Sequence, residues 1–189
     1  MKQESKENKF NKGFTLIEIL VVVLIIGVLA AIAVPQYQLA VDKAAFASYQ
    51  STAASLRDAY HEYILVHNEG TKDFSKLSFT LPGDFQVSYP HRAFNCMTNA
   101  TMFCCMSDSG ASHVAAIMCG KNDLSFMYAE SFLNKNNEPS KRNAKCKAAK
   151  DNKRAHRLCG TLGRPGSSDN NNAWTPQGVV GGYTNYLLN

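Results

Sequence analysis

The sequence predicts an α+β protein in which one long N-terminal helix packs on a small antiparallel β-sheet. Three observations predict this class. Residues 14–34 are almost entirely apolar, as in a membrane-spanning helix. From residue 35 to residue 68, apolar side chains recur at three- and four-residue steps, which is typical of an amphipathic helix. After residue 84, short apolar or alternating segments are separated by turn signals, which is typical of strands in an antiparallel sheet.

Residues 1–13 form a short basic segment that contains four lysines and two glutamates. Positive charge placed just before an apolar segment keeps that end of the chain in the cytoplasm. The sequence therefore predicts that this segment stays on the cytoplasmic side of a membrane.

The apolar segment from Phe14 to Val34 is long enough to cross a bilayer as a helix. At about 1.5 Å per helical residue it spans roughly 30 Å, which matches a hydrocarbon core. Only Thr15, Glu18 and the small Gly27 interrupt its apolar character. A single membrane-spanning helix is therefore expected over residues 14–34.

Glu18 is out of place in a plain membrane anchor. A carboxylate within an apolar span costs about 2–3 kcal/mol even on lenient insertion scales, so a partner is expected. A cut after Gly13 would create a new amine on Phe14, one helical turn from Glu18. Between two chains, such a charge pair would fix the axial position of one helix against its neighbour.

The amphipathic segment is expected to continue the same helix, so that one helix runs from about residue 15 to residue 68. Pro35 should kink it or unwind it locally. The apolar stripe is expected to bury against the rest of the chain; its members are Tyr37, Val41, Ala44, Ala45, Ser48, Leu56, Ala59, Tyr60, Tyr63 and Val66.

Three or four strands are expected after a loop at residues 70–84. The candidates are 85–89, 101–106, 113–119 and 124–129, and residues 120–123 should form a hairpin connection between the last two. Residues 179–180 and 183–188 either add an edge strand or pack against the helix. Trp174 is expected to cover apolar surface.

Six cysteines in an exported chain predict disulfides rather than free thiols. Cys96 is expected to pair across a turn with Cys104 or with Cys105. Because Cys104 and Cys105 are adjacent in a strand, they point to opposite faces and should have different partners. Cys119 would take whichever of the two remains.

Residues 134–157 are polar and carry nine lysines and arginines against two acids, Glu138 and Asp151. This segment is predicted to be a loop, and its basic part, residues 141–157, is a candidate surface for DNA phosphates or another anionic surface. The competing interpretation is a solvated loop, or one that pairs with acids of a neighbouring subunit.

The sequence offers no sign of an enzyme, a metal site or a cofactor. It has no glycine-rich phosphate loop, nucleophile elbow or paired-carboxylate constellation. Cys104, Cys105, His113 and Cys119 lie close together but lack a zinc-binding spacing. No catalytic residue and no metal ligand is therefore expected.

The hexapeptide Gly13-Phe14-Thr15-Leu16-Ile17-Glu18, the basic leader and Ala31-Ile32-Ala33-Val34-Pro35 together resemble the N-terminus of a type IV prepilin. The resemblance covers roughly residues 8–45. It implies that a prepilin peptidase cuts after Gly13 and methylates Phe14. It also implies that Glu18 and Thr15 act in assembly and that Pro35 kinks the helix.

The resemblance also implies a division of the chain and its role. Residues 1–13 would be the leader, 14–34 the membrane and filament-core helix, 35–68 its amphipathic half, and 69–189 a globular pilin head. Type IV pilins often close a C-terminal loop with a disulfide, and Cys146 with Cys159 resembles that pair. The chain would be a pilus subunit that polymerises with its own copies through an inner-membrane machinery and ends in an extracellular fibre.

Two other functions remain open at this point. The chain could instead be a pseudopilin of a type II secretion system, which forms a periplasmic pseudopilus. It could also be a single-pass membrane protein that uses its head as a binding module. The disulfide-closed loop favours a pilin over a pseudopilin, because a surface-exposed fibre benefits from covalent cross-links.

Overall fold

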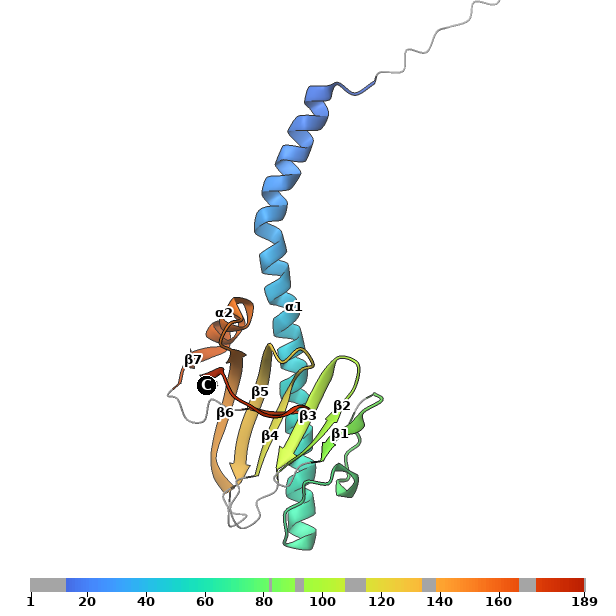
Figure 1. Ribbon diagram of the computed structural model, residues 1–189, viewed down its shortest axis with the longest axis vertical. Coiled ribbons are helices and arrows are strands. Elements are labelled where there is room, and N and C mark those ends of the chain that lie inside the picture. Colours follow the sequence, from blue (N-terminus) through green and yellow to red (C-terminus); the bar gives the residue numbers. More distant parts are fainter. Residues whose placement is uncertain are drawn as a thin grey trace, which may run out of the picture. The chain divides into compact units, whose positions relative to one another are not determined.

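The computed structural model describes residues 13–81, 83–90, 94–107, 115–133, 139–166 and 173–188. The chain divides into two compact units, residues 1–38 and residues 39–189. Each unit is described by itself below, and Figure 1 labels their helices and strands.

Helix α1 (Leu16–His67) is 52 residues long and contributes to both units. It begins and ends within a residue of the bounds that the sequence predicts. Pro35 lies inside it and the helix continues without interruption, so the expected local unwinding is wrong, while a kink stays a prediction. The helix ends where Asn68 adopts a left-handed conformation with φ of 54°, as asparagine often does at a helix C-terminus.

The head contains an antiparallel eight-stranded sheet in the order β1-β2-β3-β4-β5-β6-β10-β7 and a small two-stranded sheet of β8 and β9. A short 3-10 helix, η1 (Phe74–Lys76), follows α1, and helix α2 (Lys153–Leu162) follows β6. The strands are β1 (Gln86–Pro90), β2 (Phe94–Thr98), β3 (Met102–Ser107), β4 (Ala115–Lys121), β5 (Phe126–Leu133), β6 (Pro139–Ala149), β7 (Gly163–Pro165), β8 (Ala173–Thr175), β9 (Gly178–Val180) and β10 (Tyr183–Leu188).

The four strand candidates of the sequence correspond to β1, β3, β4 and β5, and the α+β class is confirmed. Strand β2 was not expected. The C-terminal strand β10 is not at the edge, because it lies between β6 and β7. The expected loop at 134–157 is wrong over most of its length: residues 139–149 form β6 and residues 153–162 form α2. Residues 134–138 lie outside the described residues.

One face of the sheet packs against the part of α1 that belongs to the head. The ring of Phe46 meets Tyr128 edge-on at 6.0 Å between centroids, and Tyr60 meets Phe132 in the same way at 5.5 Å. Such aromatic pairs add to the stabilisation that apolar burial supplies. The buried side chains of α1 in this core are Phe46, Tyr49, Ala53, Leu56, Ala59, Tyr60 and Tyr63.

The buried stripe of α1 differs from the expected one in its first half and at its last position. Leu56, Ala59, Tyr60 and Tyr63 are buried as expected. The exposed members are Tyr37, Val41, Ala44, Ser48 and Val66. Between residues 42 and 53 the buried positions are Asp42, Phe46, Tyr49, Thr52 and Ala53. The expected stripe was displaced by about one residue there, because a charged Asp42 was assumed to face solvent.

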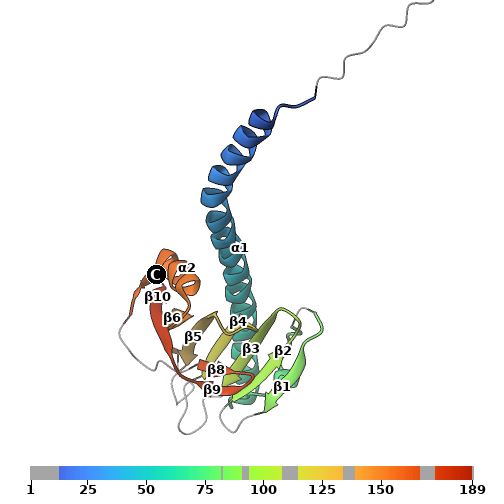
Figure 2. The ribbon, with the colours of Figure 1, turned by 45° about the horizontal axis from the view of Figure 1, so that its top comes forward.

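The opposite face of the sheet carries a second apolar cluster. Its members include Phe94, Phe103, Met127 and Tyr183, and Ala173 of β8 packs against them. Figure 2 shows β8 and β9 crossing the sheet on the side away from α1. The eight-stranded sheet is therefore covered on both faces, which explains why every residue of β3 is buried. Trp174 lies in β8, and its side chain is outside the described part of the structure.

Among the described residues, ion pairs of Arg57 and Arg154 join helices to other elements of the head. Arg57 of α1 donates to both carboxylate oxygens of Glu130 on β5, at 3.1 and 3.3 Å, and the Tyr128 hydroxyl donates to Glu130 at 2.6 Å. The guanidinium of Arg154 on α2 donates to both oxygens of Asp42, with Nη2 at 2.9 Å from Oδ1. Both carboxylates are buried, so each ion pair compensates a charge that would otherwise be costly to bury.

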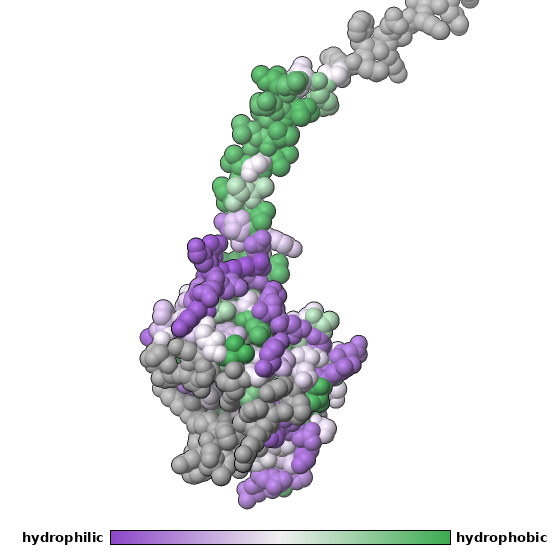
Figure 3. Space-filling model, in the orientation of Figure 1, coloured by the Kyte–Doolittle hydropathy of each residue, from purple (hydrophilic) through white to green (hydrophobic). Residues whose placement is uncertain are grey.

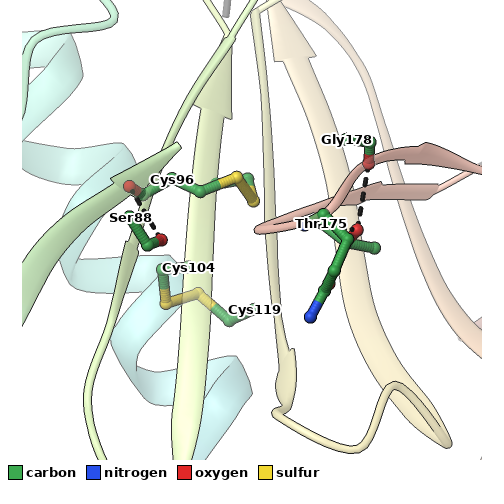
Figure 4. Close-up of a disulfide and its surroundings, with 8 residues drawn as sticks. Ser88, Cys96, Cys104, Cys119, Thr175 and Gly178 are labelled. Atoms are coloured by element: carbon green, nitrogen blue, oxygen red, sulfur yellow. Dashed lines mark hydrogen bonds between the residues drawn. A yellow bond between two sulfur atoms is a disulfide. The ribbon is translucent and has the colours of Figure 1, made fainter. Parts of the chain in front are cut away.

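Three disulfides cross-link the head. Cys96 pairs with Cys105 between β2 and β3, and Cys104 pairs with Cys119 between β3 and β4, as Figure 4 shows for the second bridge. Adjacent cysteines of β3 thus connect to different neighbouring strands through opposite faces. Cys146 pairs with Cys159, the pair that the resemblance implied, and attaches α2 to β6.

Lys147 of β6 is buried, and this burial, with a smaller contribution from Lys145, lowers the pKa of its ammonium to about 8 from an ordinary 10.5. Between these two values the unfolded chain binds more protons than the folded chain, so the free energy of unfolding should rise with pH from about 8. Above pH 10 the rise should stop, because burial raises the pKa of Tyr49 to about 12 and folding then opposes its ionisation.

Chemical denaturation of the wild type and Lys147→Met between pH 7 and pH 10 tests this expectation. The variant should lose most of the increase in the free energy of unfolding that the wild type shows as the pH rises from about 8 to about 10. A wild-type stability that stays flat or falls between pH 8 and pH 10 would contradict it.

Candidate processing and assembly site

The peptide bond between Gly13 and Phe14 lies just before α1 and is exposed. Neither residue is helical, and 82% of the surface of Phe14 is accessible. A protease binds its substrate in an extended conformation, so a non-helical, exposed bond is suited to cleavage. The structure thus places the predicted cleavage position next to the first residues of the apolar helix.

Thr15 and Glu18 form a reciprocal cap at the start of α1. The backbone N–H and the hydroxyl of Thr15 donate to Glu18 Oε2 at 3.0 and 2.9 Å, and the Glu18 N–H donates to Thr15 Oγ1 at 3.3 Å. This is a capping box, in which two residues three positions apart satisfy backbone donors at a helix start. The spacing Thr-x-x-Glu is the sequence signal for it, and the sequence analysis did not use it.

The cap changes the interpretation of Glu18. In the uncut chain, its carboxylate already accepts hydrogen bonds from Thr15 and lies at the positive end of the helix dipole. These contacts orient the carboxylate but supply no full positive charge. Within the described residues, Glu18 takes part in no ion pair. A cationic partner remains chemically favourable, and the Phe14 amine of a processed chain would provide one.

The N-terminal part of α1 presents a continuous apolar surface. From Leu16 to Val34 its leucine, isoleucine and valine side chains are between 46% and 83% exposed. Figure 3 shows this mostly hydrophobic surface along the N-terminal half of the helix. By length and composition this helix could cross a membrane. An apolar surface of this extent on a folded chain marks a membrane or protein contact.

The basic segment that the sequence singled out is divided between β6 and α2, and only part of it is exposed among the described residues. Lys147 is buried in β6, and Arg154 of α2 is engaged by Asp42. Lys150, Lys153 and Arg157 are exposed. The side chains of Lys141 and Arg142 lie outside the described part of the structure.

The cysteines of the candidate metal cluster are all engaged in disulfides, and His113 lies outside the described residues. Among the residues that the structure describes, no group of three histidine, cysteine or acidic side chains is placed to hold a metal ion.

A family profile described as the prokaryotic N-terminal methylation motif matches residues 8–34. The chain carries this methylation motif. The match includes Gly13, Phe14, Thr15 and Glu18, so the residues that form the cap and the predicted cleavage position lie within one motif.

Curated relatives of this chain are type IV pilus proteins. It is 44% identical to the type IV major fimbrial protein FimA of Dichelobacter nodosus over 63 residues, which are 33% of this chain and 40% of that protein. It is 53% identical to the type IV narrow pilus major component PilA5 of Thermus thermophilus over 49 residues, 26% of this chain and 42% of that protein.

It is also 41% identical to the type IV major pilin protein PilE of Neisseria gonorrhoeae over 66 residues, 35% of this chain and 40% of that protein. The chain thus spans about two-fifths of the length of these relatives. No solved structure matches it. The predicted resemblance to type IV prepilins is confirmed, and the long helix packed on an antiparallel sheet with disulfides is consistent with the pilin fold.

Proposed function

We propose that this protein is a structural subunit of a type IV pilus. One observation carries the proposal: an exposed apolar helix that begins with a capped Glu18 directly follows an exposed Gly13–Phe14 bond. The methylation motif and the pilus proteins among its relatives support it. The proposed role is structural, and it involves neither catalysis nor a cofactor.

In this proposal the subunit is first inserted into the inner membrane. Residues 14–34 anchor it there, residues 1–13 are the leader, and residues 69–189 form the head with the C-terminal half of α1, residues 35–68. A prepilin peptidase removes the leader after Gly13 and methylates Phe14. After extraction from the membrane, the subunit is part of an extracellular pilus.

During assembly, the apolar surface of residues 14–34 leaves the lipid and contacts the helices of neighbouring subunits. The apolar side chains of residues 14–34 pack against copies of themselves, and the inner-membrane machinery adds subunits one at a time. A head-to-tail contact that does not close produces a helical filament. The new amine of Phe14 on one subunit meets Glu18 of a neighbour, so charge pairing fixes the axial position while apolar packing holds the helices together.

N-terminal sequencing and mass spectrometry of the protein isolated from its own cells test the processing step. We expect the chain to begin with N-methylated Phe14, because the methylation motif covers residues 8–34 and Phe14 is exposed just before the apolar helix. Gly13→Val, which adds a branched side chain at the cleaved position, should leave the leader attached. Its matched control is Gly27→Val, where an added Cβ meets no atom within 4 Å and processing should be normal.

A native chain that still begins with Met1 would overturn this proposal and favour a membrane protein that binds through its head. If the chain begins with methylated Phe14, immunogold labelling separates the two functions that require processing. Labelled fibres outside the cell identify a pilus, whereas labelling confined to the periplasm identifies a secretion pseudopilus.

A further inference from the structure

Helix α2 presents an exposed basic surface on the head that the proposed filament role does not require. Its inner side is buried through Ala155, Leu158 and Cys159. Lys153 and Arg157 are one helical turn apart on its outer side, and both are exposed. The name "basic face" is used below for the exposed cations Lys150, Lys153, Arg154 and Arg157, which lie on α2 or just before it.

Several contacts hold the basic face in place. Asn152 caps α2 by accepting from the Ala155 N–H at 3.0 Å, and the Cys146–Cys159 bridge attaches the helix to β6. His156 lies 2.8 Å from the Tyr186 hydroxyl and 3.0 Å from the backbone oxygen of Lys150. The segment that carries Lys150 is therefore fixed relative to α2, and the cations need little further ordering to act together.

The basic face keeps most of its charge. Arg154 uses part of its charge on the buried Asp42, while about half of its side chain remains exposed. Asp123 is paired with Lys121, which leaves Asp151 as the exposed acid adjoining α2. Among the described residues, Lys150, Lys153 and Arg157 take part in no ion pair. The basic face thus suits a partner with several closely spaced negative charges.

The sequence position of Asp42 limits how far the basic face can be from the apolar segment. Arg154 contacts Asp42, which follows Val34 by eight residues within the unbroken helix α1. At about 1.5 Å per residue this separation is roughly 12 Å along the helix. The headgroup layer adds about 5–8 Å to each side of the hydrocarbon core, and charges act over about 8–10 Å at physiological salt.

We propose that the basic face binds the anionic phospholipid headgroups of the membrane in which residues 14–34 are anchored. The proposal rests on the proposed function, because it takes the membrane anchor as given. Anionic lipids attract clustered lysines and arginines that lie next to a membrane-spanning helix. The interaction retains the head at the bilayer surface before assembly. The contacts with lipid break when the subunit is extracted into the filament.

Lysine footprinting of the full chain in lipid nanodiscs tests the proposal. A neutral acetylating reagent is applied in phosphatidylcholine alone and in phosphatidylcholine mixed with phosphatidylglycerol, and mass spectrometry gives the rate at each lysine. Phosphatidylglycerol should slow acetylation of Lys150 and Lys153 several-fold, and about 0.5 M salt should reverse the effect by screening. Lys76, which lies in η1 beside the C-terminal turns of α1, should react equally in both lipids.

Two charge reversals separate the basic face from general charge effects. Arg157→Glu should remove the protection of Lys150 and Lys153, while Lys76→Glu, with the same change in net charge, should retain it. Both positions are exposed, so both variants should fold; the intact Cys146–Cys159 bridge, detected by mass spectrometry, checks this for the variant in α2.

Equal acetylation rates in the two lipids would overturn the proposal, as would equal protection of Lys76. Protection of Lys150 and Lys153 by a short DNA duplex in phosphatidylcholine, with none from phosphatidylglycerol, would overturn it in favour of a nucleic-acid partner. Neither result affects the proposed pilus role, which is decided by the N-terminus of the native chain and by immunogold labelling of fibres. A chain that fails to enter the nanodiscs would refute the anchor and the lipid proposal together.

Discussion

Glu18→Ala should abolish pilus fibres while the chain still inserts into the membrane. Removing a carboxylate from an apolar span lowers the cost of insertion by about 2–3 kcal/mol, so membrane fractionation should find at least the wild-type amount of protein. Without Glu18, the amine of Phe14 in a neighbouring processed subunit has no charged partner in the filament core. Electron microscopy of surface fibres and fractionation of the same cells measure both effects.

Glu18→Gln distinguishes charge pairing from helix capping. The glutamine amide oxygen can still accept from the Thr15 N–H and hydroxyl, so the cap seen in the structure can persist. Loss of a helix cap costs only about 1 kcal/mol, which is small beside the apolar packing of a filament core. We therefore expect Glu18→Gln to fail in assembly as Glu18→Ala does.

Val22→Ala is the matched control for Glu18, because it lies one helical turn further along and shortens an exposed apolar side chain without changing charge. It should still form fibres. If Glu18→Gln assembled normally and Glu18→Ala did not, the cap would be the function of Glu18. Normal fibres from both Glu18 variants would show that this residue is not required for assembly.

Arg57→Met should destabilise the head by about 3–5 kcal/mol, because it removes a guanidinium that contacts a buried carboxylate. The side chain of Glu130 is only 1% exposed, and Arg57 Nη1 lies 3.1 Å from its Oε1. Chemical denaturation in detergent, followed by near-ultraviolet circular dichroism of the core tyrosines, measures the change in the free energy of unfolding.

Adding Glu130→Gln to Arg57→Met should restore part of this loss. The amide carries no charge and can still accept the hydrogen bond that Tyr128 donates to Glu130. Asp58→Ala is the control, since it removes the other, exposed partner of Arg57 and should cost less than about 1 kcal/mol. If Arg57→Met alone lowered the free energy of unfolding by less than Asp58→Ala does, the ion pair between α1 and β5 would not stabilise the head.

The sequence predicts the long helix well because two independent signals agree there. The uniformly apolar segment ends at Pro35, where the segment with three- and four-residue periodicity begins. The helix ends before Asn68, which adopts a left-handed conformation. The prediction of the buried stripe of α1 was wrong near Asp42, because a tertiary contact there overrides the usual preference of a charged residue for solvent. That contact comes from Arg154, which is 112 residues away, so local pattern reasoning has no access to it.

Strand β6 was missed for a related reason. Its inward residues Cys146 and Ala148 alternate with Lys145, Lys147 and Ala149, and the lysines made the segment look like a solvated loop. Pairing with β5 on one side and β10 on the other overrides that composition. By contrast, the cap at Thr15 and Glu18 is a local signal that the sequence does contain.

The cysteines on β3 have a consequence for oxidative maturation. Cys104 and Cys105 are almost equally close to Cys96 along the chain, yet only Cys105 faces it across the strands. An oxidant that acts before β2 and β3 have aligned would trap Cys96 with the wrong neighbour and move the side chains of β2 to the opposite face of the sheet. Efficient production of this head should therefore depend on a thiol–disulfide exchange catalyst that can reopen early bonds.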